Sequence, residues 1–220
     1  MGKLEYLENV DHQPNSVVTV GTFDGVHMGH RAIINRVINK AEERDARSVV
    51  VTFDPHPREI ISPGDDGVRL LTTLRERFEI LDDLGVDLVC VIPFDRDFSL
   101  LTSEEFVEGF IHGKIGVSEF VIGYDHHFGR DREGDIETVE QLGEKLGFGA
   151  YVVSKQEVGR QTVSSTKIRN TISEEGNVEL AAEMLGRNYM LNGTVVHGDK
   201  RGKQIGYPTA NIKPEHPKKV

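Results

Sequence analysis

The chain has 220 residues, of which 37% are hydrophobic and 28% are charged, so we expect a folded protein with a substantial core. Its formal net charge of −10 argues against nucleic acid or an anionic membrane surface as the main partner. Cys90, the single cysteine, can form no internal disulfide, and no apolar run approaches the roughly 18 residues that cross a membrane. Because the N-terminus also lacks the apolar core of a signal peptide, we expect a cytoplasmic protein with a buried, inert thiol.

The first distinctive element is a glycine-rich stretch, residues 21–30, which follows a short apolar strand at 17–20. It leads into a segment whose apolar residues recur at helical spacing, namely Ile33, Ile34, Val37, Ile38 and Ala41. Its glycines let the backbone approach a ligand, and a helix N-terminus offers unpaired N–H groups and a positive dipole end. Because His27 and His30 lie three residues apart at this helix start, we predict a binding site for a nucleoside triphosphate.

Strands and helices then alternate along the chain. We expect further strands at 48–53, 88–92, 120–122 and 151–153, and helices at 72–84 (with a threonine cap), 102–111, 136–146, 164–172 and 178–185. The strands are nearly continuous apolar runs, which is typical of parallel strands covered by helices on both faces. We therefore predict a doubly wound α/β domain, built on a five-stranded parallel sheet, over residues 1–185.

Unusual sequences follow the expected strands. They are the glycine-rich stretch 21–30, an Asp-Pro-His-Pro turn at 54–57, the loop 123–130 and the segment 164–169. In doubly wound sheets, ligands bind beyond the carboxyl ends of the strands, where the strand order reverses. We therefore expect these four segments to form one site.

The character of the sequence changes near Gly186. Residues 188–196 and 206–212 combine turn residues with β-formers and have no helical period. We interpret residues 186–220 as the start of a small antiparallel β domain. A piece of about 35 residues is unsuited to hold a core alone, so we expect either part of a longer domain or a disordered tail.

Several motifs resemble a known family. His27-x-Gly-His30 and Ser164-Ser-Thr-Lys-Ile-Arg169 resemble the nucleotidyltransferase superfamily, in which the two motifs bracket ATP. Three neighbouring segments, Thr-Phe-Asp-Pro-His-Pro (52–57), Phe-Gly-x-x-Arg-x-Gly (128–134) and Leu-Gly-Arg (185–187), look like those of the bacterial FAD synthetases, the bifunctional riboflavin kinase/FMN adenylyltransferases. The stretch 202–211 resembles the Gly-x-Pro-Thr-Ala-Asn signature of that family's C-terminal kinase domain, a β-barrel. The resemblance covers nearly the whole chain in the family's order.

The resemblance implies that the protein joins ATP and FMN to give FAD and pyrophosphate, with Mg²⁺ on the triphosphate. The implied catalytic residues are His27, His30, Asp125 and Arg169. The implied ATP-binding residues are Gly21, Thr22, Phe23, Asp24, Gly25, His27, Gly29, His30, Ser164, Ser165, Thr166 and Arg169. The implied FMN-binding residues are Asp54, Pro55, His56, Pro57, Asp125 and Phe128. In the kinase segment the implied ATP and Mg²⁺ residues are Gly206, Pro208, Thr209 and Asn211, with Thr209 and Asn211 as the metal ligands.

Two departures from the family pattern bear on function. His126 stands where the family more usually has an aromatic residue, which changes the expected flavin contact. The family's catalytic glutamate of the kinase lies downstream of the Pro-Thr-Ala-Asn signature and is missing from these 220 residues. We therefore expect them to carry out adenylyl transfer from ATP to FMN but not the phosphorylation of riboflavin.

Other interpretations remain open at this point. His27 and His30 would make half of a zinc site if His126 or His127 supplied further ligands, although no cysteine cluster or HExxH pattern supports one. The Asp-Pro-His-Pro turn would be only a rigid turn, and residues 164–166 would be only a helix cap. The whole chain would also fit a nucleotidyltransferase acting on another phosphorylated substrate, or a flavin-binding module without catalysis.

Overall fold

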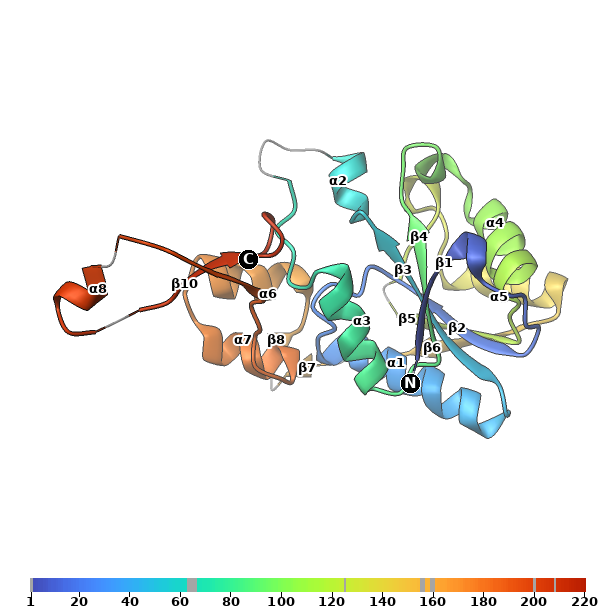
Figure 1. Cartoon of the computed structure of the whole chain (residues 1–220). Helices are drawn as coiled ribbons and strands as arrows, with labels where there is room; N and C mark the ends of the chain where they lie inside the picture. Colours follow the sequence, from blue (N-terminus) through green and yellow to red (C-terminus); the bar gives the residue numbers. More distant parts are fainter. Residues whose placement is uncertain are drawn as a thin grey trace.

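A six-stranded parallel sheet forms the centre of the molecule (Figure 1). The computed structural model describes residues 2–62, 67–124, 126–154, 157–158, 161–199, 201–207 and 209–220. Across the sheet the strands follow the order β1-β4-β3-β2-β5-β6. Their bounds are Lys3–Tyr6 (β1), Ser16–Val20 (β2), Arg47–Asp54 (β3), Leu88–Pro93 (β4), Glu119–Gly123 (β5) and Gly149–Val153 (β6).

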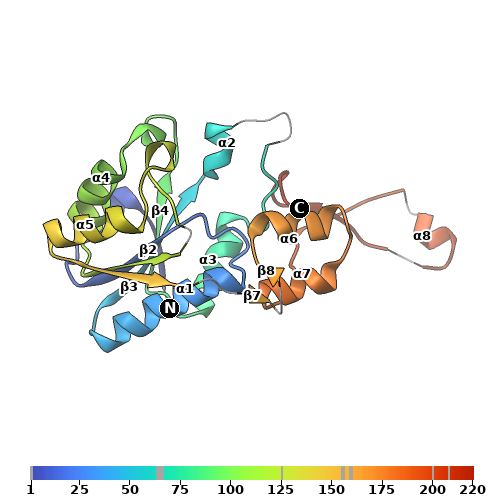
Figure 2. The ribbon, with the colours of Figure 1, turned by 180° about the vertical axis from the view of Figure 1, so that it is seen from behind.

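Helices cover both faces of the sheet, as Figures 1 and 2 show from opposite sides. Helices α1 (Met28–Glu43) and α3 (Leu74–Asp83) pack on one face, and α4 (Ser103–Phe106) and α5 (Ile136–Leu146) pack on the other. The remaining helices are α2 (Pro57–Ile61), α6 (Ser165–Ser173), α7 (Val178–Leu185) and α8 (Arg201–Gln204). This arrangement confirms the predicted doubly wound α/β class.

The apolar runs in the sequence follow from burial on both faces. In β3, Val49 and Val51 join the core beneath α4 and α5, whereas Val50 joins the core beneath α1 and α3. Every residue of β2 and β5 is buried. A strand that is covered on both sides has no polar face, so its sequence does not alternate.

The strand order reverses between β2 and β5. From β2 the chain moves through β3 to β4 on one side, and β5 and β6 lie on the other side. The loops that leave the carboxyl ends of β2 and β5 therefore diverge and open a crevice between them, which is where doubly wound sheets bind ligands.

The sheet has one strand more than the five predicted. Strand β1 pairs with β4 at the edge of the sheet, and three of its four side chains are exposed. Its sequence, Lys-Leu-Glu-Tyr, therefore carries no apolar run by which it could be recognised.

Three smaller differences concern helices and turns. Helix α2 begins at Pro57, where we expected an extended turn, because proline fits the first position of a helix. The helix expected at 102–111 continues past α4 as a π-helix, Val107–Ile115. A short strand pair, β7 (Glu157–Val158) and β8 (Gln161–Thr162), had no sequence signal.

The expected threonine cap is Thr73, which forms a capping box with Glu76 at the start of α3.

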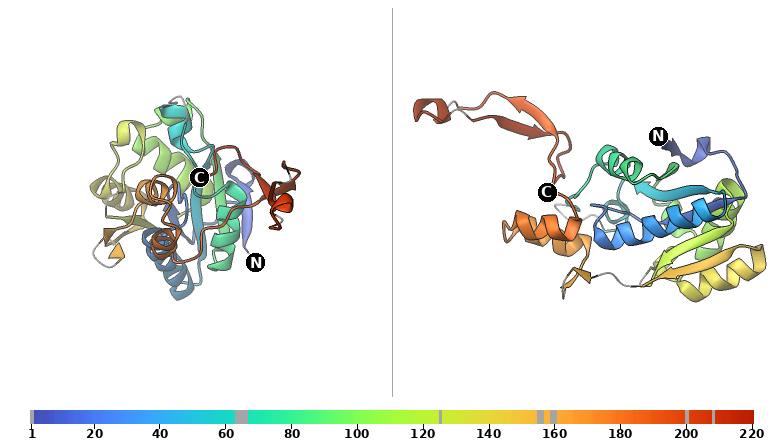
Figure 3. Two further views of the ribbon diagram at one scale, coloured as in Figure 1. Left: turned by 90° about the vertical axis from the view of Figure 1, so that its left-hand side faces the viewer. Right: turned by 90° about the horizontal axis from the view of Figure 1, so that it is seen from below.

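The C-terminal part contains the expected antiparallel strands. Beyond Gly186, which ends α7 with a φ of 68°, β9 (Gly193–Val196) pairs with β10 (Asn211–Pro214). These strands and α8 extend away from the sheet as an arm (Figures 1 and 3), and all residues of both strands are exposed. The chain then returns, and Lys218–Val220 pack along Leu70 in the body of the molecule.

Two further expectations concern the thiol and the membrane. Cys90 is buried within β4, which confirms the expected burial, and burial raises the pKa of its thiol to about 12, which disfavours the reactive thiolate. Across the described ranges, none of the helices combines the length and apolar character needed to cross a membrane.

Candidate active site

A tight turn connects β2 to α1. Phe23 and Val26 adopt positive φ angles of 46° and 38°, and Gly25 between them has a φ of 82°. The backbone N–H of Gly25 donates to Thr72 Oγ1 at 2.9 Å, and a Cβ on Gly25 would lie 2.8 Å from Leu71 Cδ1. Glycine is needed here because the turn is left-handed and presses against the segment before α3.

His27 and His30 stand side by side at the start of α1. His27 is the cap residue of the helix, and its Nδ1 accepts a hydrogen bond from the backbone N–H of His30 at 3.3 Å. The two imidazole rings stack with their centroids 3.6 Å apart, and Phe23 contacts His30 edge-on at 5.2 Å. The cap hydrogen bond therefore orients the His27 ring, and the His30 ring packs against His27 and Phe23.

Both imidazoles are uncharged near neutral pH. Burial lowers the pKa of His27 to about 4, against the opposing effect of Asp24. Burial, together with His27 and the buried Arg77, lowers the pKa of His30 well below its usual value. Because Nδ1 of neutral His27 is an acceptor, its proton lies on Nε2, which is left as a donor. The Nδ1 atom of His30 is buried and has no hydrogen-bond partner among the described residues.

Asp24 lies beneath the turn with its carboxylate fully buried. It accepts hydrogen bonds from the backbone N–H groups of Leu71, at 3.0 Å, and Thr72, at 2.9 Å, and from Arg169 Nη2 at 2.6 Å. Burial would raise the pKa of Asp24, but Arg169, Arg77 and the two amide donors outweigh burial and hold the pKa below its usual value. Asp24 is therefore an ionised anchor for Arg169.

The start of helix α6 lies next to the turn after β2. Ser164 caps this helix by accepting from the N–H of Lys167 at 3.3 Å, so the capping interpretation of Ser164 is correct. Ser165 Oγ donates to the backbone carbonyl of Asp24 at 2.9 Å, and Arg169 Nε donates to the carbonyl of Arg69 at 2.6 Å. These contacts join the start of α6 to the turn after β2.

The Asp-Pro-His-Pro turn continues the site at the end of β3. The Asp54–Pro55 peptide bond is cis. His56 caps α2 through an Nδ1 atom that accepts from the N–H of Arg58 at 3.2 Å, and burial lowers the pKa of His56 to about 4. The turn therefore caps α2, and its residues His56 and Pro57 also line the cavity of the site.

A cavity of about 1020 Å³ lies between these segments. The predicted site residues on its wall are Gly21, Thr22, Phe23, His27, Gly29, His30, His56, Pro57, Phe128, Ser164, Ser165, Thr166 and Arg169. Asp24, Gly25, Asp54 and Pro55 are not part of the lining, and Asp125 lies outside the described residues. The four unusual segments thus meet at one cavity, as the alternation of strands and helices predicted.

The wall of the cavity is positively charged although the chain as a whole is acidic. Asp131 is the one carboxylate among the described lining residues. Five arginines line the cavity, namely Arg58, Arg96, Arg130, Arg132 and Arg169. The formal net charge of the chain is −10. Positive charge concentrated in a concave site of an acidic protein favours anionic ligands such as phosphates.

Comparison with known proteins identifies the family. The family model described as FAD synthetase matches residues 9–167. The chain belongs to this family. A second family model, described as riboflavin kinase, matches residues 185–220.

Curated relatives agree with this membership. The bifunctional riboflavin kinase/FMN adenylyltransferase of Listeria monocytogenes is 39% identical over 199 residues, covering 90% of this chain and 62% of the relative. The proteins of the same description from Escherichia coli and Bacillus subtilis are 36% and 35% identical and cover 94% and 92% of this chain. The chain spans 62% to 66% of the length of these relatives.

Solved structures support the fold. A crystal structure described as a macrolide-efflux protein from Streptococcus pneumoniae is 30% identical, with a TM-score of 0.86, and covers 97% of this chain and 69% of that chain. The pantoate-beta-alanine ligase of Francisella tularensis has a TM-score of 0.50 at 14% identity and covers 91% of each chain, a likeness of fold alone.

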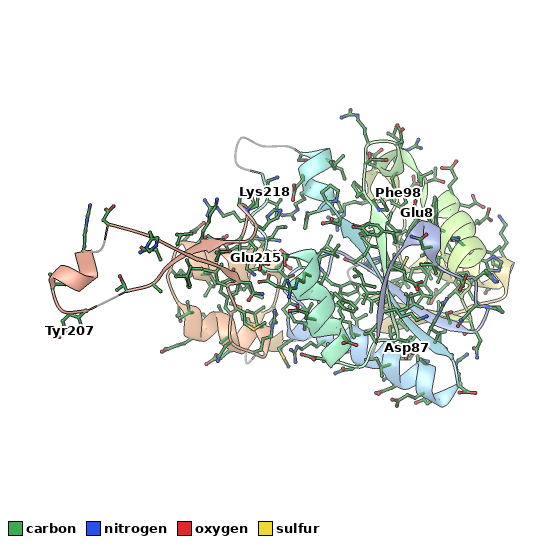
Figure 4. All side chains as sticks on the ribbon, viewed as in Figure 1. Glu8, Asp87, Phe98, Tyr207, Glu215 and Lys218 are labelled. Carbon is green, nitrogen blue, oxygen red and sulfur yellow. The ribbon has the colours of Figure 1, made fainter. Side chains whose placement is uncertain are left out.

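Several lining residues of this FAD synthetase family member were not recognised from the sequence. Phe53, near the end of β3, and Phe94 and Phe98, beyond the end of β4, form an aromatic cluster with ring centroids 5.5 to 6.1 Å apart. Figure 4 shows Phe98 beyond the end of β4. Phenylalanines next to strands are indistinguishable in sequence from core residues, so only the topology reveals that these rings face a cavity.

Arg77 is a second site feature without a sequence signal. It lies on α3, is 2% exposed, and donates from Nη1 to Thr52 Oγ1 at 2.7 Å and to the Phe53 carbonyl at 3.2 Å. Thr52 in turn donates to the carbonyl of Thr22 in the turn after β2 at 3.1 Å. The buried Arg77 cation therefore lowers the pKa of His30 and contributes to keeping that imidazole neutral.

The kinase signature residues lie apart from this cavity. Gly206, Thr209 and Asn211 are exposed on the arm, and Pro208 lies outside the described residues. A Cβ atom on Gly198 would lie 2.3 Å from Asn211 Nδ2. A Cβ atom on Gly202 would lie 3.0 Å from Thr209 Oγ1. Glycines at 198 and 202 thus allow the polar side chains of the signature to pack closely on the arm.

The described residues contain no group of three or more histidine, cysteine, aspartate or glutamate side chains that could hold a metal ion. The alternative of a zinc site at His27 and His30 is therefore wrong for the described part of the chain.

Proposed function

We propose that the protein is an FMN adenylyltransferase, which joins ATP and FMN to give FAD and pyrophosphate. One observation carries this proposal: the His27–His30 turn and the Ser164–Arg169 helix start together line one cavity with an arginine-rich wall. Its volume of about 1020 Å³ is at the upper end of the usual range for ligand sites, about 300–1,000 Å³, and suits two substrates at once.

The reaction needs positioning and charge neutralisation more than covalent chemistry. An oxygen of the FMN phosphate attacks the α-phosphorus of ATP. The bond from that phosphorus to the oxygen bridging it to the β-phosphorus breaks, and its electron pair leaves with pyrophosphate. Since the attacking phosphate oxygen is ionised at neutral pH, no general base is required. The protein has to hold two anions in line and stabilise the transferred and leaving groups.

His27 and His30 are proposed to donate hydrogen bonds to phosphate oxygens. Neutral imidazoles suit this role because each retains one N–H donor, and their rings are already oriented by the helix cap and by stacking on each other. Arg169 is proposed to contact the leaving phosphates. Its guanidinium is held by Asp24 and by the Arg69 carbonyl, so little rearrangement is needed when ATP binds.

The remaining ATP contacts are proposed for the backbone of 21–29 and for Ser164, Ser165 and Thr166, all at helix starts that favour phosphate. Asp24 and Gly25 support this wall from behind, because neither lines the cavity. Asp125 remains a proposed catalytic residue on family resemblance alone.

The flavin is proposed to lie toward His56, Pro57 and Phe128. The aromatic cluster of Phe53, Phe94 and Phe98 provides an apolar wall on the same side, suited to a planar ring system. Asp54 and Pro55 are proposed to shape this end through the turn that places His56 and Pro57 on the wall.

Mg²⁺ is proposed to reach the site on the triphosphate of ATP, where it would neutralise phosphate charge. Proteins commonly hold this ion through substrate phosphates and only one or two carboxylates, which agrees with the small number of carboxylates on this wall. For the riboflavin kinase activity of a longer chain, Gly206, Pro208, Thr209 and Asn211 are proposed to bind ATP, with Thr209 and Asn211 as ligands of Mg²⁺. We further propose that residues 1–185 form the adenylyltransferase domain, that 186–220 belong to the kinase domain, and that the enzyme acts in the cytoplasm.

The test is incubation of the protein with ATP, Mg²⁺ and FMN, followed by chromatographic separation of the flavins. FAD and an equal amount of pyrophosphate are the expected products, and CTP or riboflavin in place of ATP or FMN should give none. Absence of FAD from a folded sample would overturn the proposal. Product from CTP, or from another phosphorylated substrate but not FMN, would indicate a different nucleotidyltransferase, and FMN binding without turnover would indicate a flavin-binding module.

A further inference from the structure

The end of the described chain lies against the active-site half of the molecule. The backbone N–H of Leu70 donates to the Lys218 carbonyl at 2.7 Å, and the N–H of Val220 donates to the Leu70 carbonyl at 3.0 Å. In Figure 4, Lys218 marks the place where this end meets the rest of the molecule. A segment matched by the riboflavin kinase family is thus hydrogen-bonded to the connection before α3.

Lys219 is buried in this contact. Its Nζ donates to Glu76 Oε2 at 2.7 Å and to the carbonyl of Leu71, and both charged side chains are 2% exposed. The ammonium group also lies 4.8 Å from the centre of the Tyr189 ring, whose hydroxyl donates to the Val220 carbonyl. Fully buried lysines are rare and need such partners, so this contact requires a buried cation with hydrogen-bond donors.

The same connection holds the catalytic arginine from its other side. The backbone N–H groups of Leu71 and Thr72 bind the Asp24 carboxylate, and the Arg69 carbonyl accepts from Arg169 Nε. Asp24 and Arg169 then bind each other at 2.6 Å. Residues 69–72 therefore lie between Lys219 on one side and the Asp24–Arg169 pair on the other.

We propose that Lys219 is a positioning residue of the adenylyltransferase site. By holding the Leu71 carbonyl against Glu76 at the start of α3, Lys219 keeps residues 69–72 in the arrangement that orients Asp24 and Arg169. The kinase-matching segment thereby influences adenylyl transfer without contacting ATP. This inference rests on the proposed function, since it assigns Arg169 to the phosphates of ATP.

The kinetic expectation follows from the part of the site that Lys219 reaches. In Lys219→Met, Arg169 is held less firmly, so kcat/KM for ATP falls roughly 3- to 30-fold, the scale on which residues remote from a site modulate it. The KM for FMN is expected to stay unchanged, because the flavin is proposed to lie against Phe53, Phe94 and Phe98, whereas Lys219 holds the Leu71 carbonyl. Lys219→Arg, which keeps the charge and the donors, restores most of the activity.

Lys219→Met leaves Glu76 buried without its partner and therefore lowers the stability of the fold. The double variant Glu76→Gln/Lys219→Met removes both charges and keeps an amide oxygen for the Thr73 N–H, so it should fold. Lys213→Met, at an exposed position of β10, is the matched control and should have wild-type kinetics. Activities are compared per folded molecule, at a temperature below the unfolding of every variant.

The outcomes separate the two proposals. If wild-type protein makes no FAD, the proposed function fails. If wild-type protein makes FAD, and Lys219→Met and Glu76→Gln/Lys219→Met both retain its kcat/KM for ATP, Lys219 is only a structural contact and the inference fails. A parallel rise in the KM values for ATP and FMN would also overturn it.

A measurement on the wild-type chain avoids reliance on the variants. Because coupling between two sites is reciprocal, ATP binding must stabilise the contact made by Lys219. Amide exchange at Leu70 and Val220 should slow when Mg²⁺ and ATP are bound, whereas exchange at the arm residues Thr194 and Val195 should not change. Unaltered exchange at Leu70 and Val220 under saturating ATP would contradict the inference.

Discussion

Asp24 and Arg169 are 145 positions apart in the sequence, yet their side chains form an ion pair of 2.6 Å beside the cavity. The carboxylate is fully buried, and the arginine side chain is 12% exposed. Since two backbone N–H groups also hold the carboxylate, the pair is fixed from both sides. The arginine that we assign to the leaving phosphates is therefore oriented before ATP binds.

The first prediction concerns this pair. Asp24→Asn removes the charge that anchors Arg169 and leaves the arginine in a partly buried position. We expect the free energy of unfolding to fall by about 3 kcal/mol, as it does when other buried ion pairs lose one partner. We expect kcat/KM for ATP to fall at least roughly 10-fold. The fall should stay below the roughly 100- to 1,000-fold loss that complete removal of a transition-state donor causes. Denaturant unfolding and steady-state kinetics measure the two effects.

Asp83→Asn is the control for the first prediction, because Asp83 is exposed at the end of α3. It should change neither quantity. Wild-type kcat/KM in Asp24→Asn would show that Arg169 keeps its orientation without the ion pair.

The second prediction concerns His30. His30→Ala removes a proposed donor to the phosphates from the start of α1, and we expect FAD formation to fall at least ~100-fold. His12→Ala, an exposed histidine before β2, should have wild-type turnover. Circular dichroism should confirm that both variants are folded, and near-normal turnover of His30→Ala would refute its role.

The histidines and Arg169 were recognisable in the sequence because their motifs have fixed local spacing. The contacts that orient Arg169 were not, because Asp24 and the Arg69 carbonyl meet it only through the folding of distant segments. Alternation of strands and helices predicted that the special segments share one edge of the sheet. It carried no information on which loop lies beneath another.

The same distinction applies to buried charge and to the edge of the sheet. Glu76 and Lys219 are 143 positions apart and look like solvated surface residues in the sequence, although they are buried against each other. Strand β1 mixes charged and apolar residues because an edge strand exposes most of its side chains. Sequence patterns report burial along one element, and these features depend on pairing between elements.

The third prediction concerns pH and stability. The folded pKa values of His27 and His56 are lowered to about 4, whereas an unfolded histidine titrates near 6.5. Below pH 6.5 the unfolded chain therefore binds protons that the folded chain does not. Their contribution to stability is complete above pH 6.5 and is lost as the pH falls toward 4, by about 1.4 kcal/mol per pH unit for each histidine.

Urea unfolding at pH 7.5, 6 and 5 measures this slope. His56→Asn retains a side-chain oxygen that can cap α2 and should reduce the slope by the share of one histidine. Asp24, whose pKa is lowered, destabilises the fold only as the pH falls below about 3.8, outside this window. Stability that does not change between pH 7.5 and 5 would contradict the buried, neutral state of these histidines.

The last prediction concerns the flavin side of the cavity. Phe98 is half-buried, lines the cavity and contacts Phe53 and Phe94. Phe98→Ala should weaken FMN binding roughly 5- to 100-fold, the effect of losing one aromatic stacking partner of a planar ring. The affinity for ATP should not change, because ATP is assigned to the start of α1 and the start of α6. Titration of FMN fluorescence measures the first affinity, and calorimetry measures the second.

Phe110 provides the matched control. It is also half-buried and packs on Phe98 with ring centroids 5.5 Å apart, but it is not part of the cavity lining. Phe110→Ala should therefore lower stability about as much as Phe98→Ala while leaving the affinity for FMN unchanged. If both variants weaken FMN binding equally, the aromatic cluster acts through packing alone, and the flavin does not lie against Phe98.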